Sequence, residues 1–203
     1  MWKTRRNLEV NPRVSMALIT PARQGWIIKG DFQEFQRTGP YFDRQMSSNL
    51  LRYNAYTGIR DAGLVRIAAV EGSFAISKVQ VALDFFLAKL AASGAGKRTT
   101  GGVVIPLPVR QEFARMAAVK VLAWLKGDGY PVAVPCLSLQ PAGERGLVGR
   151  PGTQRPPENA PAAANILTFA AVSYQVKGQW TGGVLQVQEV YAGGPPLPGG
   201  RVA

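Results

Sequence analysis

The sequence predicts a mainly β protein with flanking helices, of the α+β class, built as two modules. Three observations support this prediction. Apolar segments with strand-like alternation are bounded by Gly and Pro turns. A similar order of strands occurs twice, and a Gly-rich segment at 93–102 separates the two occurrences. We therefore place the first module at 1–92, a linker at 93–107 and the second module at 108–203.

The first module opens with a short helix. Thr4 can cap a helix over Arg5–Val10, and Asn11 ends it because a residue before proline is disfavoured in the α region. Strands are expected at Val14–Thr20, Trp26–Phe35 and Leu64–Val70, and apolar residues near helical spacing predict a helix at Phe74–Ala92.

The second module opens with a longer amphipathic helix. Its apolar residues, among them Phe113, Val121 and Leu125, predict a helix from Val109 to Lys126. After it we expect a strand at Tyr130–Leu139, whose prolines suit a sheet edge or a strand start, and a short strand at Leu147–Val148. A Pro/Ala/Gly-rich loop at Gly149–Ala164 and strands at Ile166–Gln179 and Val184–Tyr191 follow.

Two short segments resemble each other. Trp26–Phe32 reads WIIKGDF and Tyr174–Trp180 reads YQVKGQW, and apolar strands precede and follow each of them. In the second module a helix and a strand stand further upstream, whereas in the first the chain starts close before the repeat. We therefore interpret the second module as complete and the first as the C-terminal part of the same architecture.

Composition excludes several kinds of chemistry. The chain has no histidine, so it contains no Ser-His-Asp triad, Cys-His pair or histidine-based metal site. Its single cysteine, Cys136, lies in an apolar run and is expected to be a buried structural thiol. One cysteine, with no signal peptide and no uninterrupted apolar span, fits the cytoplasm and predicts no membrane contact.

The chain is strongly basic. Lysine and arginine number 24 against 12 acidic residues, a formal net charge of +12, which attracts polyanions such as nucleic acid or phosphorylated cofactors. The basic residues are scattered and do not alternate with aromatic residues along one strand, so we do not expect nucleic acid as the partner.

A specific likeness runs through the first 42 residues. The pattern Lys3-Thr4, Asn7-Leu8 and Asn11-Pro12-Arg13-Val14, followed by Gly25-Trp26, Ile28-Lys29-Gly30 and Gly39-Pro40, resembles the pyridoxamine 5′-phosphate oxidase-like family of FMN-binding split β-barrels. Small bacterial FMN-binding proteins are the nearest likeness. Asp128-Gly129-Tyr130-Pro131 is also similar to the family's opening hairpin.

The resemblance implies a split antiparallel β-barrel that dimerises, with flavin at the interface. The Lys3-Thr4 position would hold the FMN phosphate, because lysine supplies a charge while the hydroxyl and the next helical N–H groups supply donors. The cofactor-binding residues implied or considered are Trp2, Lys3, Thr4, Arg5, Gln24 and Trp26. The tryptophans would stack on the ring and Gln24 would hydrogen-bond to it.

The chain departs from the family pattern in both modules. The hairpin that should precede Lys3 is absent, and the second module lacks the Lys-Thr segment. Two explanations remain: an intrachain pseudo-dimer with one flavin site, or truncation of a larger tandem protein, which we favour. We expect a flavoprotein that carries electrons or acts on a small molecule with unidentified catalytic residues, as a homodimer or pseudo-dimer. The alternatives are an F420-dependent reductase, a basic nucleic-acid-binding β module and a non-catalytic remnant.

Overall fold

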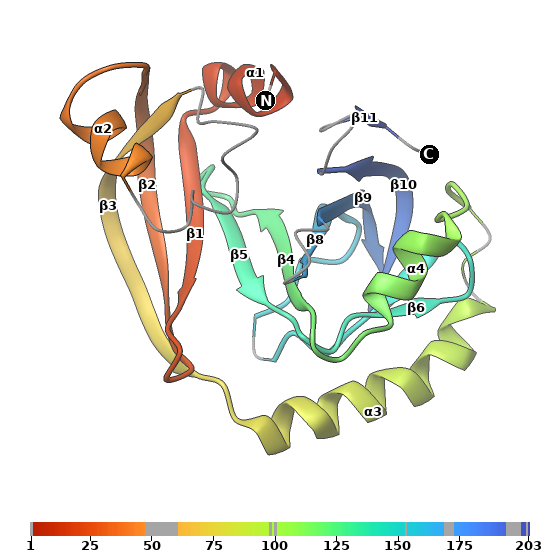
Figure 1. The fold of residues 1–203 in the computed structure, drawn as a ribbon. Coiled ribbons are helices and arrows are strands. Elements are labelled where there is room, and N and C mark those ends of the chain that lie inside the picture. Colours follow the sequence, from red (N-terminus) through yellow and green to blue (C-terminus); the bar gives the residue numbers. More distant parts are fainter. Residues whose placement is uncertain are drawn as a thin grey trace.

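A computed structural model describes residues 2–47, 61–97, 99, 101–152, 154–168, 173–193, 200–201 and 203. Strands predominate in it and form two antiparallel sheets with helices beside them, which confirms the expected class (Figure 1). Among the described residues, no strand pairing closes either sheet into a barrel.

The first sheet is a meander in the order β1-β2-β3. Its strands and neighbouring helices are α1 (Trp2–Val10), β1 (Arg13–Ile19), β2 (Gln24–Gln36), α2 (Pro40–Met46) and β3 (Ala62–Ala75). The three expected strands are confirmed, with β3 longer than expected. The helix α1 already begins at Trp2, so Thr4 lies within its first turn and does not cap it.

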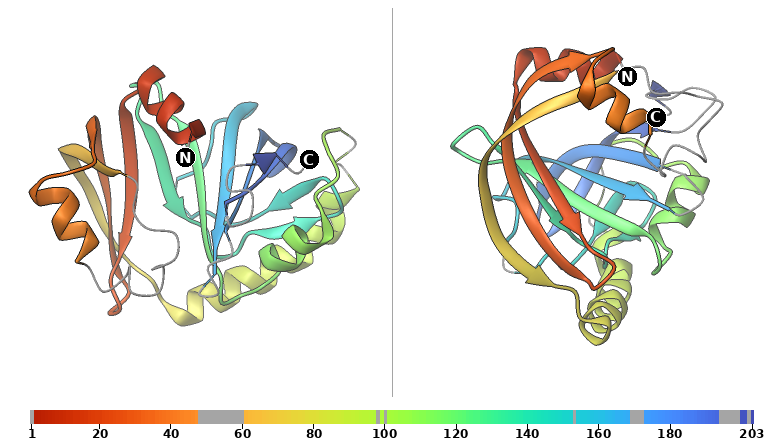
Figure 2. Two further views of the ribbon diagram at one scale, coloured as in Figure 1. Left: turned by 45° about the horizontal axis from the view of Figure 1, so that its top comes forward. Right: turned by 60° about the vertical axis from the view of Figure 1, so that its left-hand side comes forward.

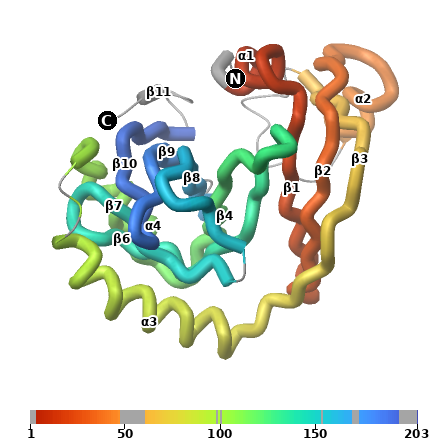
Figure 3. Tube along the Cα trace, turned by 180° about the vertical axis from the view of Figure 1, so that it is seen from behind, coloured from red at the N-terminus to blue at the C-terminus, as the bar shows by residue number. Residues whose placement is uncertain are grey.

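The helix α3 (Lys78–Gly96) leads from the first sheet to the second and runs beneath it (Figures 1 and 3). Ser77 caps it by accepting a hydrogen bond from Gln80 N, so the helix starts later than expected. Residues 93–96, expected in the linker, form its last turn, where Ala92 and Ala95 pack near β6 and β7. By length and composition alone α3 could cross a membrane, but one such helix is weak evidence for a membrane span.

The second sheet has the order β5-β4-β8-β9-β10-β7-β6, with β11 paired to β10. Its elements are α4 (Leu107–Phe113), β4 (Val119–Leu125), β5 (Pro131–Pro135), β6 (Gln140–Ala142), β7 (Gly146–Val148), β8 (Ala160–Leu167), β9 (Ser173–Thr181), β10 (Val184–Ala192) and β11 (Gly200–Arg201). The strand β5 begins at Pro131 and lies at an edge of the sheet, as its prolines predict, but it ends at Pro135, so the expected strand up to Leu139 is wrong in its last part. Four residues connect β5 to β6 at the other end of the sheet, so the sheet is strongly curved.

The helix expected over Val109–Lys126 is wrong beyond α4, because residues 119–125 form strand β4. Side chains of this strand alternate, with Lys120, Leu122 and Trp124 buried. Apolar residues in this segment fit both the helical and the strand period. Pairing with β5 on one side and β8 on the other satisfies the backbone and decides for the strand.

The loop expected at Gly149–Ala164 is also wrong in its last part. Residues 160–164 belong to β8, which lies between β4 and β9, and Ala162 and Ala164 are buried. Alanine is depleted in strands, so the sequence carried little strand signal here. The strand expected at Ile166–Gln179 is divided between β8 and β9, and residues 169–172 lie outside the described part.

The internal repeat corresponds to a repeated structure. Strands β1-β2-β3 and β8-β9-β10 are both antiparallel meanders. In the first, one residue of β3 bulges between the partners of Lys29 and Gly30. In the second, one residue of β10 bulges between the partners of Lys177 and Gly178. The Lys-Gly pair therefore stands opposite the same irregularity in both meanders.

Both glycines are required by close approach of the opposing strand. A Cβ on Gly30 would come 2.7 Å from the carbonyl oxygen of Arg66. A Cβ on Gly178 would collide with the corresponding carbonyl oxygen of Gln186. Each carbonyl belongs to the residue before the glycine's pairing partner, so the two bulges share their geometry as well as their position.

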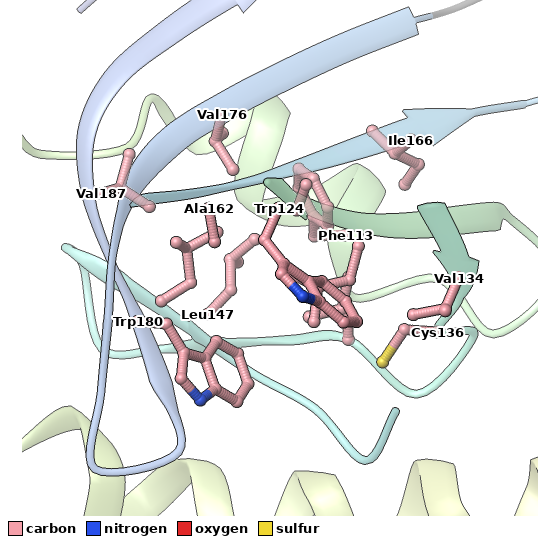
Figure 4. Packing of buried hydrophobic residues seen from close by; sticks show 14 of the residues in the cluster. Phe113, Trp124, Val134, Cys136, Leu147, Ala162, Ile166, Val176, Trp180 and Val187 are labelled. Carbon is pink, nitrogen blue, oxygen red and sulfur yellow. The ribbon is translucent and has the colours of Figure 1, made fainter. Parts of the chain in front are cut away.

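The main hydrophobic core lies within the second sheet (Figure 4). Phe113 from α4 and Trp124 from β4 meet Leu147, Val176 and the neighbouring side chains there. Of the buried residues in this cluster, only one of the described members comes from the first sheet, Ile27. The first sheet therefore contacts the second mainly through groups outside that core.

Candidate functional site

A charged cluster joins the first sheet to the turn between β4 and β5. Lys29 Nζ lies 2.8 Å from Glu71 Oε1 on β3 and 3.0 Å from Asp128 Oδ2 in the turn, and its side chain is 7% exposed. The hydrogen bond to Glu71 raises the pKa of Lys29 above its ordinary value, against the opposing effect of burial. Lys29 therefore stays protonated and acts as a clamp, not as a base.

Tyr130 extends this cluster. Its hydroxyl donates to Asp31 Oδ1 at 2.7 Å, and this hydrogen bond raises the pKa of Tyr130 and lowers the pKa of Asp31. Arg66 lies 3.4 Å from the same carboxylate. Arg13 donates to the carbonyl oxygen of Asp128 at 2.6 Å. These charges are paired, so the cluster holds the two sheets together and offers no obvious acid or base for catalysis.

The contact of Arg13 with the turn between β4 and β5 requires a glycine at position 129. Gly129 has φ +78°, and a Cβ there would collide with the guanidinium of Arg13. The side chain of Asn11 also reaches its carbonyl oxygen, at 3.4 Å. The Asp-Gly-Tyr-Pro segment is thus the point where the second module meets the first.

A cleft of about 350 Å³ lies below this junction, between the first sheet, the start of α3 and β5. Its apolar wall includes Ile27, and its polar groups include Gln80, Asp84, Ser138 and Arg150. Arg150 Nε lies 3.1 Å from Asp84 Oδ1, and its backbone N–H donates to Ser138 Oγ at 2.9 Å. The volume is at the lower end of small-molecule pockets, but its charged groups already pair with each other.

A second cavity of about 470 Å³ adjoins the cleft and shares Asp84 and Arg150 with it. Its wall adds Arg155, Glu158 and Trp180. Glu158 accepts a hydrogen bond from the backbone N–H of Gly182 at 2.8 Å, which fixes the loop before β8 against the β9–β10 turn. The cavity is therefore lined by groups that shape the loops around it.

Lys120 is a buried residue that sequence reasoning missed. It is fully buried, and its Nζ donates to the carbonyl oxygens of Leu137 and Leu139 at 3.3 and 2.9 Å. Burial lowers the pKa of Lys120 to about 8 and raises the pKa of nearby Cys136 to about 11. The expected burial of Cys136 is confirmed, and its high pKa makes it a poor nucleophile.

The residues predicted to bind a cofactor do not converge. The side chains of Trp2 and Lys3 lie outside the described part. Thr4 and Arg5 are exposed on α1, where the Arg5 guanidinium lies 3.6 Å from Glu9 and 5.3 Å from the centre of the Phe35 ring.

The other two predicted residues lie at the far end of the first sheet. Gln24 is exposed beside the β1–β2 turn, and Trp26 is partly buried opposite Leu18. The helix α1 joins the opposite end of β1, which has seven residues and so spans about 20 Å. Neither Gln24 nor Trp26 lines the cleft. The structure thus separates the predicted phosphate and ring contacts within one chain.

Comparison with family models, with curated proteins and with solved structures found no match to this chain.

Proposed function

We propose that the chain is an FMN-binding flavoprotein of the split β-barrel type, which carries electrons or acts as an oxidoreductase on a small molecule. The observation that carries the proposal is the repeated meander with its Lys-Gly bulge. The first copy of this unit follows directly after α1, which holds the Lys3-Thr4 pair. This order of elements supports the likeness on which the proposal rests.

The donors of α1 suit a phosphate group. Thr4, Arg5 and Arg6 are exposed, and the first turn of the helix contains no acidic residue. Free N–H groups and the positive end of the helix dipole attract an anion there. FMN, when bound, supplies hydride and single-electron transfer. We assign the phosphate to this helix and leave the ring contacts unassigned, because Gln24 and Trp26 lie at the other end of the sheet.

The first experiment measures whether the purified protein binds flavin. We expect absorbance near about 450 nm, or quenching of FMN fluorescence when the cofactor is added. Binding of F420 and not FMN would change the proposed cofactor to the deazaflavin, with its phosphate assigned to the same helix. A protein that binds neither would contradict the proposal and favour the non-catalytic remnant. Salt-sensitive binding to random oligonucleotides instead would favour the basic β module.

The second experiment locates the phosphate. We expect Lys3→Ala to weaken FMN binding by about 1.5–3 kcal/mol, the value of a hydrogen bond to a charged group. Lys89→Ala is the matched control, because Lys89 is exposed on α3, a helix on the opposite side of the molecule from α1 (Figure 1). Equal affinities of the two variants, measured by fluorescence titration, would show that the phosphate binds elsewhere.

A further inference from the structure

The outer side of α3 carries a line of large apolar side chains in contact with solvent. Spacings of three and four residues place them on one face of the helix, named here the outer stripe: Val79, Leu83, Phe86, Leu87 and Leu90. Val79 and Leu90 are 79% and 75% exposed, and Phe86 is 60% exposed. A surface helix of a soluble protein normally places polar residues on the side away from the core, so the outer stripe marks an interaction surface.

No described element covers the outer stripe. Figures 1 and 3 show α3 along the lower border of the molecule, with no other described element below it in either view. The right-hand view of Figure 2 looks nearly along the helix and shows it outside both sheets. The outer side of α3 is therefore accessible over the length of the stripe, which is about 17 Å for three turns of helix.

The inner side of α3 is fixed to the second sheet. Phe85 and Ala88 are buried, and Ala92 and Ala95 pack beside β6 and β7. The ring of Phe85 also lies 5.2 Å from the buried ammonium of Lys120. These contacts keep α3 against the sheet, so the helix cannot leave the fold to cross a membrane, but its outer side can lie on one.

The charges beside the outer stripe are basic. Lys78 and Lys89 stand about three turns apart on one flank of it, and Lys97 follows the last turn; all three are exposed. Arg23 is also exposed, and its carbonyl oxygen accepts a hydrogen bond from Ile76 N at 2.9 Å, which places the β1–β2 turn beside the start of α3. Long basic side chains of this kind reach from an apolar surface to the headgroups around it.

The acidic charge of α3 is compensated on its inner side. Asp84 is the one acidic residue in the sequence of this helix. Its carboxylate lies 3.1 Å from Arg150 Nε and accepts a hydrogen bond from Gln80 Nε2 at 3.0 Å. The outer side of α3 therefore presents apolar groups in its centre and positive charge at its edges, on a chain whose net charge is +12.

We propose that α3 docks this chain on an anionic lipid surface, with the outer stripe inserted at the boundary between headgroups and acyl chains. The apolar side chains then leave water, and the lysines meet the negatively charged headgroups. A lipid surface combines an apolar interior with negative charge around it, which is the complement of this helix face. The sequence predicted no membrane contact because it has no uninterrupted apolar span, but a helix that lies in the plane of the surface does not require one.

The experiment measures sedimentation of the full chain with vesicles of phosphatidylcholine and phosphatidylglycerol, and with vesicles of phosphatidylcholine alone. We expect binding to the mixed vesicles that weakens with added salt, because salt screens the lysines from the headgroups. Leu83→Glu and Phe86→Glu should each lower the partition coefficient at least about tenfold. Ile67→Glu is the matched control, because it adds the same charge at a side chain of β3 that is 59% exposed, and it should bind as wild type does.

Circular dichroism verifies that the variants fold, which is expected because the substituted side chains are exposed. A wild-type chain that stays in the supernatant would overturn the proposal, as would equal binding to vesicles of phosphatidylcholine alone. Binding that survives both α3 substitutions would show that scattered basic residues attract the vesicles, and binding that only Ile67→Glu removes would assign the contact to the first sheet. A chain that avoids vesicles and instead self-associates through Leu83 and Phe86, measured by light scattering, would also contradict it.

Discussion

Lys120 shows how a charged side chain is tolerated in a core. Its ammonium group is fully buried in the curved second sheet, and two carbonyl oxygens of the segment between β5 and β6 accept its hydrogen bonds. The ring of Phe85 on α3 lies 5.2 Å from the same nitrogen. These partners offset part of the desolvation cost of the charge, and the lowered pKa of Lys120 shows that a part remains.

This residue predicts a pH dependence of stability. The pKa of Lys120 is about 8 in the folded chain against an ordinary value of 10.5. Above pH 8 the unfolded chain therefore holds a proton that the folded chain has lost, and raising the pH stabilises the fold. The raised pKa of Cys136 acts in the opposite direction only above its ordinary value of 9.0. Between about pH 7.5 and 9 the free energy of unfolding should gain at most about 1.4 kcal/mol per pH unit from Lys120.

Denaturant unfolding of wild type and Lys120→Met at several pH values measures this contribution. As the pH rises from about 7.5 to 9, the free energy of unfolding of wild type should increase relative to that of Lys120→Met. Lys89→Met, at an exposed site on α3, should follow the wild-type slope. Parallel profiles for wild type and Lys120→Met would show that the buried ammonium does not titrate in this range.

At the scale of elements, the bulge opposite each Lys-Gly pair defines the repeated meander. The glycine lets the opposing carbonyl approach, and the bulge increases the local twist of the strands. In the second meander the twisted strands enclose the core. In the first meander, one face carries the ion pairs and lies at the junction with the second sheet. The opposite face exposes apolar side chains such as Ile67 and Val70 to solvent.

The bulge predicts that one added methyl group at Gly178 destabilises the fold. Gly178→Ala should lower the free energy of unfolding by about 1–3 kcal/mol or more, because its Cβ would collide with the backbone of Gln186 and the strand must shift. Gly127→Ala is the control, since no atom lies within 4 Å of a Cβ there, and should change stability by about 0.5 kcal/mol or less. Similar thermal midpoints for both variants would contradict the close approach.

At the scale of the whole molecule, the two sheets contribute unequally to the hydrophobic core. The second holds nearly all of the described members of the main buried cluster, and α3 packs against its β6 and β7 edge. The first contributes Ile27 to that cluster and is attached through Lys29 and Tyr130 contacts. The stability of the first sheet therefore depends on its contacts with the second module.

Two fragments test this inequality. The segment 78–203 keeps α3 with the second sheet and should unfold cooperatively with a thermal midpoint below that of the full chain. The described residues of the segment 1–77 form no buried cluster of their own, so this segment should remain unfolded as a monomer. Circular dichroism and heteronuclear NMR spectra compare them. An unfolded 78–203 fragment would show that the first sheet is required for the core to form.

The likeness of the two modules was readable from the sequence because it depends on local features. The Lys-Gly pairs, the alternation of the first strands and the prolines of β5 all act within a few residues. The strands β4 and β8 were not readable. Their residues fit a helix or a loop as well as a strand, and partners distant in the sequence decided between these states.

The candidate site was also predictable from the sequence only in part. The sequence predicted a set of cofactor-binding residues, but Thr4 and Gln24 lie at opposite ends of β1 in the fold. The pairing of Lys29 with Asp128, the burial of Lys120 and the exposure of Ile67 and Val70 on β3 were likewise decided by tertiary structure. By itself, the sequence determined a β-rich chain with a repeated Lys-Gly strand unit, because these depend on short-range periodicity and turn chemistry. Which face of each unit became core depended on contacts across the chain that no local pattern encodes.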